Sequence, residues 1–219
     1  MESVSNGNTP HEALVRMLAL SRAFDDDVYA LLEKGWSVSS QRVRICFALS
    51  KAATEHAVSQ RVLIEAGLHG TALGLIRLQF EAVVRAAWVL HGAKDDWLVK
   101  FSTPVPEGDL SEPHLGPPIP SMLDAIEPYA PQAVIEFRRL HMTVKVMHSF
   151  VHGGAHLVVH ALRGYPPEKL VAVLQNRNLL TLMLTNVIVI ASQRSELSGI
   201  VSQLRTMHVG CMPPTNPPP

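Results

Sequence analysis

The segment 71–93, TALGLIRLQFEAVVRAAWVLHGA, has the pattern of a helix that is apolar nearly all round. A helix of this kind normally lies in the middle of a bundle and not on its surface. Yet Arg77, Glu81 and Arg85 recur in it at i, i+4 and i+8, so they form one stripe that drifts only ~80° round the helix axis. Because buried charges need partners, this stripe predicts a polar pocket within an apolar bundle.

Helix signals recur along the rest of the chain, and no stretch shows the alternation of a half-buried strand. Thr9, Pro10 and Glu12 form a capping-box start for a first helix that ends at Gly35. Further helices are expected from Ser40 to about Gly67 and over the ranges 121–129, 131–152, 168–194 and 196–206. The expected fold is all-α: an up-and-down bundle of about five long helices with several short ones.

The chain is expected to form one domain over residues 9–207, because 219 residues suit a single core. Residues 1–8 are polar, and residues 208–219 end in CMPPTNPPP, so both ends are expected to be disordered. Six prolines fall between positions 102 and 120, which predicts a long loop there. A loop of that length is a lid, a binding segment or a plain connection.

Composition narrows the class of protein. Hydrophobic residues make up 47% of the chain and charged residues 17%, which is typical of a globular protein with a large core. Lysine plus arginine and aspartate plus glutamate each number 19, and this balance argues against a broad electrostatic grip on nucleic acid while leaving room for a local basic groove.

The cysteines and the termini suggest a compartment. Cys46 and Cys211 are isolated, which favours a reducing environment. The N-terminus lacks the pattern of a signal peptide, and the longest uncharged run, 178–193, is too short for a membrane span. We expect a cytoplasmic protein with no membrane association.

Asp25 and the two aspartates after it are expected on a solvated helix face, with metal ligation as the alternative.

Histidines cluster in the segment 141–160. His148, His152, His156 and His160 are spaced one helical turn apart, but Gly153 and Gly154 weaken the helix between the first pair and the second. Two imidazoles at i and i+4 can converge on a metal ion. The alternative is a pair of hydrogen-bonded structural histidines.

The charged stripe of segment 71–93 and this histidine segment are expected to face each other. In a polar pocket, Glu81 would lie between the guanidinium groups of Arg77 and Arg85, which would keep its carboxyl ionised. It could then orient a histidine from a neighbouring helix, and His56 and His152 are the candidates. The alternative is a purely structural ladder of ion pairs along one helix.

The pattern LIRLQFEAVVRAAW, followed about sixty residues later by HSFVHGG, resembles a group of uncharacterised bacterial helical-bundle proteins. That group is similar to the HEPN-like superfamily, in which toxin, abortive-infection and RNase domains are common. The resemblance covers about residues 55–162. RNA-cutting members carry an arginine four to six residues before a histidine, whereas here Arg139 precedes His148 by nine.

The resemblance implies a metal-independent RNase or toxin that acts in phage defence without a cofactor. His152 would be its acid/base residue and His148 the partner, while Arg77, Glu81 and Arg85 would hold phosphate or shape the pocket. RNA or an antitoxin-like protein would be the partner, and the chain would form a homodimer.

Two other interpretations stay open. The element His148-x-x-x-His152-Gly also resembles the metal-binding motif of DinB-like bundles. That resemblance implies a divalent transition metal held by His56, His148 and His152. The third interpretation is a scaffold or binding module without catalysis, which would fit the neutral charge and the lack of standard catalytic motifs.

Overall fold

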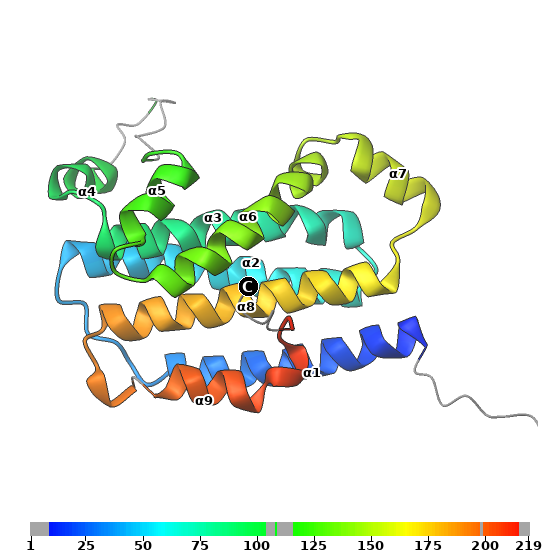
Figure 1. Cartoon of the computed structure of the whole chain (residues 1–219), viewed down its shortest axis with the longest axis horizontal. Helices are drawn as coiled ribbons and strands as arrows, with labels where there is room; N and C mark the ends of the chain where they lie inside the picture. The colour runs from blue at the N-terminus through cyan, green and yellow to red at the C-terminus, as the bar shows by residue number, and fades with distance from the viewer. Residues whose placement is uncertain (1–8, 104–107, 109–115, 198, 215–219) are drawn as a thin grey trace, which may run out of the picture.

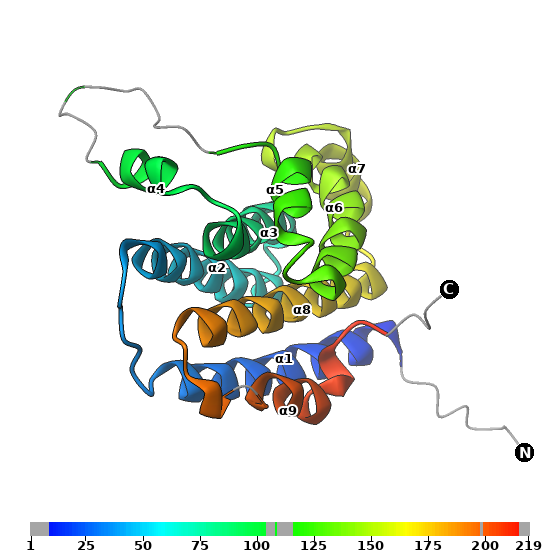
Figure 2. The same ribbon diagram turned by 60° about the vertical axis from the view of Figure 1, so that its left-hand side comes forward.

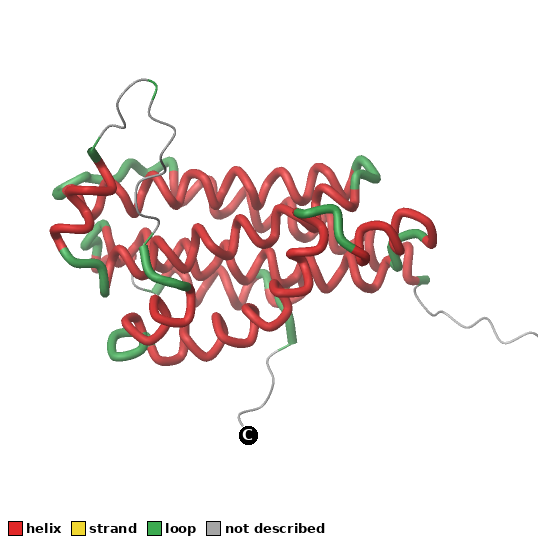
Figure 3. Tube along the Cα trace, turned by 90° about the horizontal axis from the view of Figure 1, so that it is seen from above, coloured by secondary structure: helices red, strands yellow, loops and turns green. Residues whose placement is uncertain are grey.

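The computed structural model describes residues 9–103, 108, 116–197 and 199–214. Over these residues the chain is all-helical, without strands, as the sequence predicts (Figure 3). Five helices have 21 to 25 residues: α1 (Pro10–Leu32), α2 (Gln41–Glu65), α3 (His69–His91), α6 (Pro131–Val151) and α8 (Pro167–Ala191). Four are short: α4 (Asp95–Ser102), α5 (Ile119–Ile126), α7 (Ala155–Arg163) and α9 (Ile200–Met207).

Helix α8 runs through the middle of the molecule and packs against α1, α2 and α3 (Figure 1). Helices α2 and α3 form an antiparallel hairpin across the short turn at Gly67, whose φ of +77° suits glycine. Helix α3 lies between α2 on one side and α6 with α5 on the other (Figure 2). It is therefore the interior helix that its apolar composition predicts.

Local sequence signals explain where the helices begin and end. The Thr9 side chain and the Glu12 carboxylate form the expected capping box, and Ser40 caps α2 through the Val43 N–H. The glycine pair after His152 breaks the histidine segment as expected: α6 ends at Val151 and α7 begins at Ala155. Gly153 takes a φ of +68°, which disfavours other residues.

Helix α8 is long and apolar enough to cross a membrane, and it is the only such helix among the residues the structure describes. However, 72% of its most apolar window is buried inside the protein. Buried residues such as Leu174, Leu180 and Leu184 contact helices on several sides. The all-round apolarity of α8 is thus explained by its position in the core.

The proline-rich C-terminal segment differs from the expectation. Residues 209–211 form a 3₁₀ turn (Val209–Cys211), and the Cys211 and Met212 side chains are 1% and 5% exposed against the bundle. Apolar burial and a hydrogen bond to the Cys211 carbonyl hold this part in place, so the expected disorder from 208 onward is wrong for 208–212. Residues 1–8, 215–219 and most of the expected 102–120 loop lie outside the described residues.

Candidate functional site

A cavity of about 320 Å³ lies between α3 and α6, next to the start of α5. We call it the Arg77 pocket. Its polar lining comes from two helices, with Arg77 and Glu81 on α3 and His141, Lys145 and His148 on α6. Phe80, Ile119 and Val144 form its apolar wall. Arg77 and Glu81, two of the three residues of the charged stripe, thus line one cavity with His148 of the histidine segment.

Arg77 connects the two helices. Its Nε donates to Glu81 Oε1 over 2.7 Å, and its Nη1 contacts His148 Nδ1. Because a guanidinium has no acceptor, Nδ1 of His148 must accept this hydrogen bond. This contact therefore suits a neutral imidazole that carries its proton on Nε2.

The Arg77–Glu81 pair is only partly desolvated, since the two side chains are 30% and 32% exposed. A pair of this kind adds little to stability. It does restrict the rotation of the guanidinium, so one arginine edge is presented toward His148.

His141 lies deeper in the same pocket. Its ring stacks on Phe80, with a centroid distance of 5.8 Å and an interplanar angle of 6°. Burial, assisted by Lys145, lowers the pKa of His141 below its usual range, while Glu81 opposes that shift. His141 is therefore mainly neutral at pH 7 and able to accept a proton.

The pocket carries more positive than negative charge. Arg77 and Lys145 are cations, and Glu81 is its one carboxylate among the described lining residues. Such an arrangement favours an anionic ligand, and the planar guanidinium suits phosphate or carboxylate oxygens.

The remaining predicted site residues lie outside this cavity. His152 is exposed at the end of α6, with its ring centroid 4.1 Å from that of His148. Arg85 is half-buried on α3, two turns from Arg77, and does not line the pocket. No hydrogen bond joins Glu81 to His152 or His56 in the described structure; the histidine that the stripe engages is His148, through Arg77.

Sequence reasoning did not assign a role to His141 or Lys145. The signal was their spacing, because residues 141, 145 and 148 follow i, i+4, i+7 and so share one face of α6. The His148–His152 spacing, by contrast, does not include the positions of His141 and Lys145.

The three proposed metal ligands, His56, His148 and His152, do not lie close together in the structure. His56 is on α2, while His148 and His152 are on α6, and α3 lies between these helices (Figure 2). Over the described ranges, no three histidine, cysteine, aspartate or glutamate side chains are grouped closely enough to hold a metal ion. Burial lowers the pKa of His56, with Glu55 opposing the shift, and this is the effect of partial burial in the bundle.

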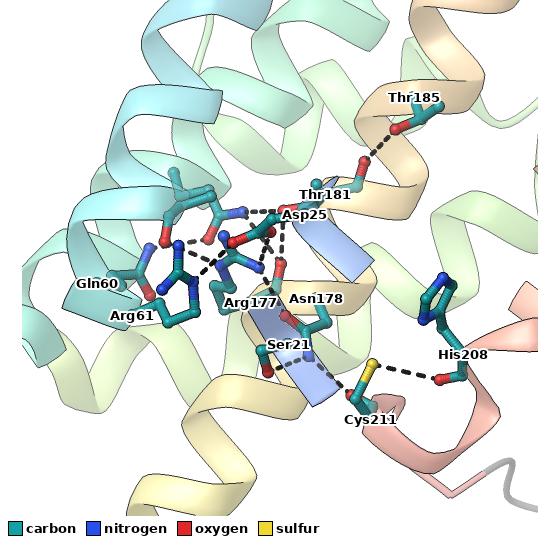
Figure 4. A network of polar contacts seen from close by, with 12 residues as sticks. Ser21, Asp25, Gln60, Arg61, Arg177, Asn178, Thr181, Thr185, His208 and Cys211 are labelled. Atoms are coloured by element: carbon teal, nitrogen blue, oxygen red, sulfur yellow. Dashed lines mark hydrogen bonds and ion pairs between the residues drawn. The ribbon is translucent and has the colours of Figure 1, made fainter. Parts of the chain in front are cut away.

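A second polar cluster, which we call the Arg177 network, lies in the core between α1, α2 and α8 (Figure 4). Arg177 is fully buried, and its Nη1 is 2.5 Å from Asp25 Oδ1. Asp25 Oδ2 also accepts from Arg61 Nε over 2.8 Å. Asp25 is only 3% exposed, so the expectation of a solvated face is wrong for it, although the next two aspartates are exposed.

The network continues through amides and hydroxyls. Gln79 accepts from Gln60 and donates to Thr181. Asn178 donates to Ser21 Oγ and to the Cys211 carbonyl, each over 2.9 Å, so the C-terminal segment is hydrogen-bonded to α8. Burial raises the pKa of the Cys211 thiol to about 11, which makes the thiol inert. Because its members bond mainly to one another, the network is structural.

The fold and the Arg77 pocket thus define an all-helical protein with an anion-favouring cavity between α3 and α6. The chain belongs to a family of unknown function, DUF6988, whose model matches residues 50–214. The match includes every residue of the Arg77 pocket. No curated protein and no solved structure matches the chain, and none of these comparisons links it to the HEPN-like superfamily.

Proposed function

We propose that the Arg77 pocket binds a phosphate group of RNA. The histidines of α6 would cleave the RNA strand at that phosphate without a metal ion. The observation that carries this proposal is the contact of Arg77 with Glu81 on one side and His148 on the other, in a cavity that also holds His141 and Lys145. Two cations and two imidazoles line this cavity, and a third imidazole, that of His152, lies beside His148; metal-independent phosphodiester cleavage can use groups of these kinds.

The reaction would be transfer of the phosphate to the neighbouring 2′-hydroxyl. Neutral His141 takes the 2′-hydroxyl proton as O2′ bonds to phosphorus, and the bond from phosphorus to O5′ breaks. His152, exposed beside His148, gives the proton that O5′ needs. Arg77, Lys145 and the Nε2–H of His148 stabilise the phosphate oxygens as negative charge develops on them.

This assignment fixes the expected pH dependence. The base must be neutral and the acid protonated, so the rate should follow a bell-shaped curve. Because burial lowers the pKa of His141, the acidic limb of this curve should lie at a lower pH than it would for an ordinary histidine. Chelators should leave the rate unchanged.

The experiment is cleavage of a fluorogenic RNA oligonucleotide by purified protein in the presence of EDTA. Wild type is compared with His148→Ala, His141→Asn and Arg77→Met, and His156→Ala is the control because it removes an exposed histidine of α7 outside the pocket. Each pocket variant should lose about 10²-fold or more in rate. Expression of the wild type, but not of His148→Ala, should also degrade cellular RNA and slow growth.

A separate binding measurement distinguishes the two parts of the proposal. A 3′-mononucleotide is titrated into wild type and Arg77→Met, and NMR shifts of histidine ring protons are followed. Binding without RNA cleavage would overturn the nuclease assignment and leave a phosphate-binding module. Absence of binding would overturn the pocket assignment as well. Elemental analysis of untagged protein that finds stoichiometric zinc, nickel or iron would contradict the metal-free mechanism.

A further inference from the structure

A second cavity, of about 300 Å³, lies over the C-terminal half of α8. We call it the α8 groove. Helix α6 forms one side of it and α9 the other, and α8 lies between them in Figure 1 and Figure 2. It uses the first half of α6, whereas the Arg77 pocket uses the second half, and the two cavities share no lining residue.

The floor of the α8 groove is apolar. Ile126, Phe137, Leu179 and Leu182 line it and are each less than 5% exposed, and Met183 lies beside them half-buried. An apolar floor below an open mouth is the usual anatomy of a small-molecule site. Methionine also adapts to ligands of different shape.

The rim of the groove carries one carboxylate and one cation, which differ in whether they have an ion-pair partner. Glu136 and Arg205 both line it, but Glu136 is held by Arg139 over 2.9 Å on its own helix. Arg205 is exposed on the opposite wall, and in the part of the chain that the structure describes no carboxylate pairs with it. The cation is thus available to a ligand, while the carboxylate is paired with Arg139.

The other polar groups at the mouth are uncharged. Asn186, the exposed amide of α8, lines the groove, as do Gln132 on α6 and Ser202 on α9. His91 stacks on Tyr129 with a centroid distance of 5.2 Å and an interplanar angle of 13°. Burial lowers the pKa of His91, so this imidazole is mainly neutral at pH 7 and adds hydrogen bonding and a flat face.

We propose that the α8 groove binds a small organic acid, with an aromatic or branched aliphatic body on the apolar floor and a single carboxylate at Arg205. The volume suits a compact ligand and not a peptide helix or a lipid chain. Arg205 supplies the charge, and Asn186, which also lines the groove, can supply a hydrogen bond. The site is independent of the RNA cleavage proposed for the Arg77 pocket.

The test uses 2-naphthoate and its neutral analogue 2-naphthylmethanol, each titrated by calorimetry into the full-length protein. A ligand of this size is expected to bind wild type with a Kd of about 1 mM or tighter. Arg205→Gln should weaken naphthoate by about tenfold and leave the alcohol unchanged. Arg163→Gln, an exposed arginine of α7, is the matched control for loss of one charge.

A filling substitution tests the location. Ala133→Trp places an indole in the groove and should abolish binding of both probes, whereas Ile135→Trp, exposed on the same helix outside the groove, should not. Thermal melts establish that both variants fold; if Ala133→Trp does not, Ala130→Phe replaces it at the same cavity. No binding to folded wild type at several millimolar, or equal weakening by the two arginine variants, overturns the proposal.

Discussion

Two arginine–carboxylate pairs in this protein have the same chemistry and opposite surroundings. Arg177 and Asp25 come from helices at the two ends of the sequence and are 0% and 3% exposed. Arg77 and Glu81 are one turn apart on α3, are about a third exposed, and line a cavity with histidines. The buried Arg177–Asp25 pair joins α8 to α1. The partly exposed Arg77–Glu81 pair leaves guanidinium N–H groups available to a ligand in the cavity. Burial, more than residue type, separates the structural pair from the pair that we propose to be functional.

The largest effect should follow from breaking the buried pair. Asp25→Ala leaves the Arg177 charge in the core without its carboxylate, and we expect a loss of about 3–5 kcal/mol in the free energy of unfolding. Urea denaturation measures it. Asp26→Ala, the exposed neighbour, should change stability by less than about 0.5 kcal/mol. Equal losses for the two variants would show that the Arg177 network has no special structural role.

A smaller effect should follow from loosening the C-terminal segment. Asn178→Leu removes the donors to Ser21 and to the Cys211 carbonyl, which should cost about 1–3 kcal/mol. The Cys211 thiol should then react with a thiol reagent faster than in wild type, as read by mass spectrometry. Cys46, whose pKa burial raises to about 12, is the internal control and should stay protected. If Cys211 stays equally protected, the segment does not depend on Asn178.

The smallest effect on stability should come from breaking the partly exposed Arg77–Glu81 pair. Glu81→Gln should lower the free energy of unfolding by less than about 1 kcal/mol, because an i, i+4 pair a third exposed contributes little. Its RNA cleavage should still fall, since Arg77 loses the group that orients it. Glu136→Gln breaks the similar Glu136–Arg139 pair outside the Arg77 pocket and should cost as little without affecting cleavage. A large drop in melting temperature with unchanged activity would instead favour the purely structural interpretation.

Much of the fold was readable from local sequence. Periodicity, the Thr9–Glu12 capping box and the glycines after His152 predicted the class of fold and most helix boundaries, because each signal acts within a few residues. The apolar composition of segment 71–93 also predicted an interior helix. The alignment of Arg77 and Glu81 could be predicted for the same reason, since one helical turn brings them together.

The tertiary structure alone decided which distant residues meet. Asp25 and Arg177 are separated by most of the chain, and an aspartate in a polar run gives no local sign that a partner will bury it. Arg77 meets His148, and not His152 or His56, because the rotation of α6 against α3 selects one face of that helix. Local sequence determined the helices and the position of the charged stripe. Packing determined which charges became structural and which face a cavity, since desolvation depends on neighbours from every part of the chain.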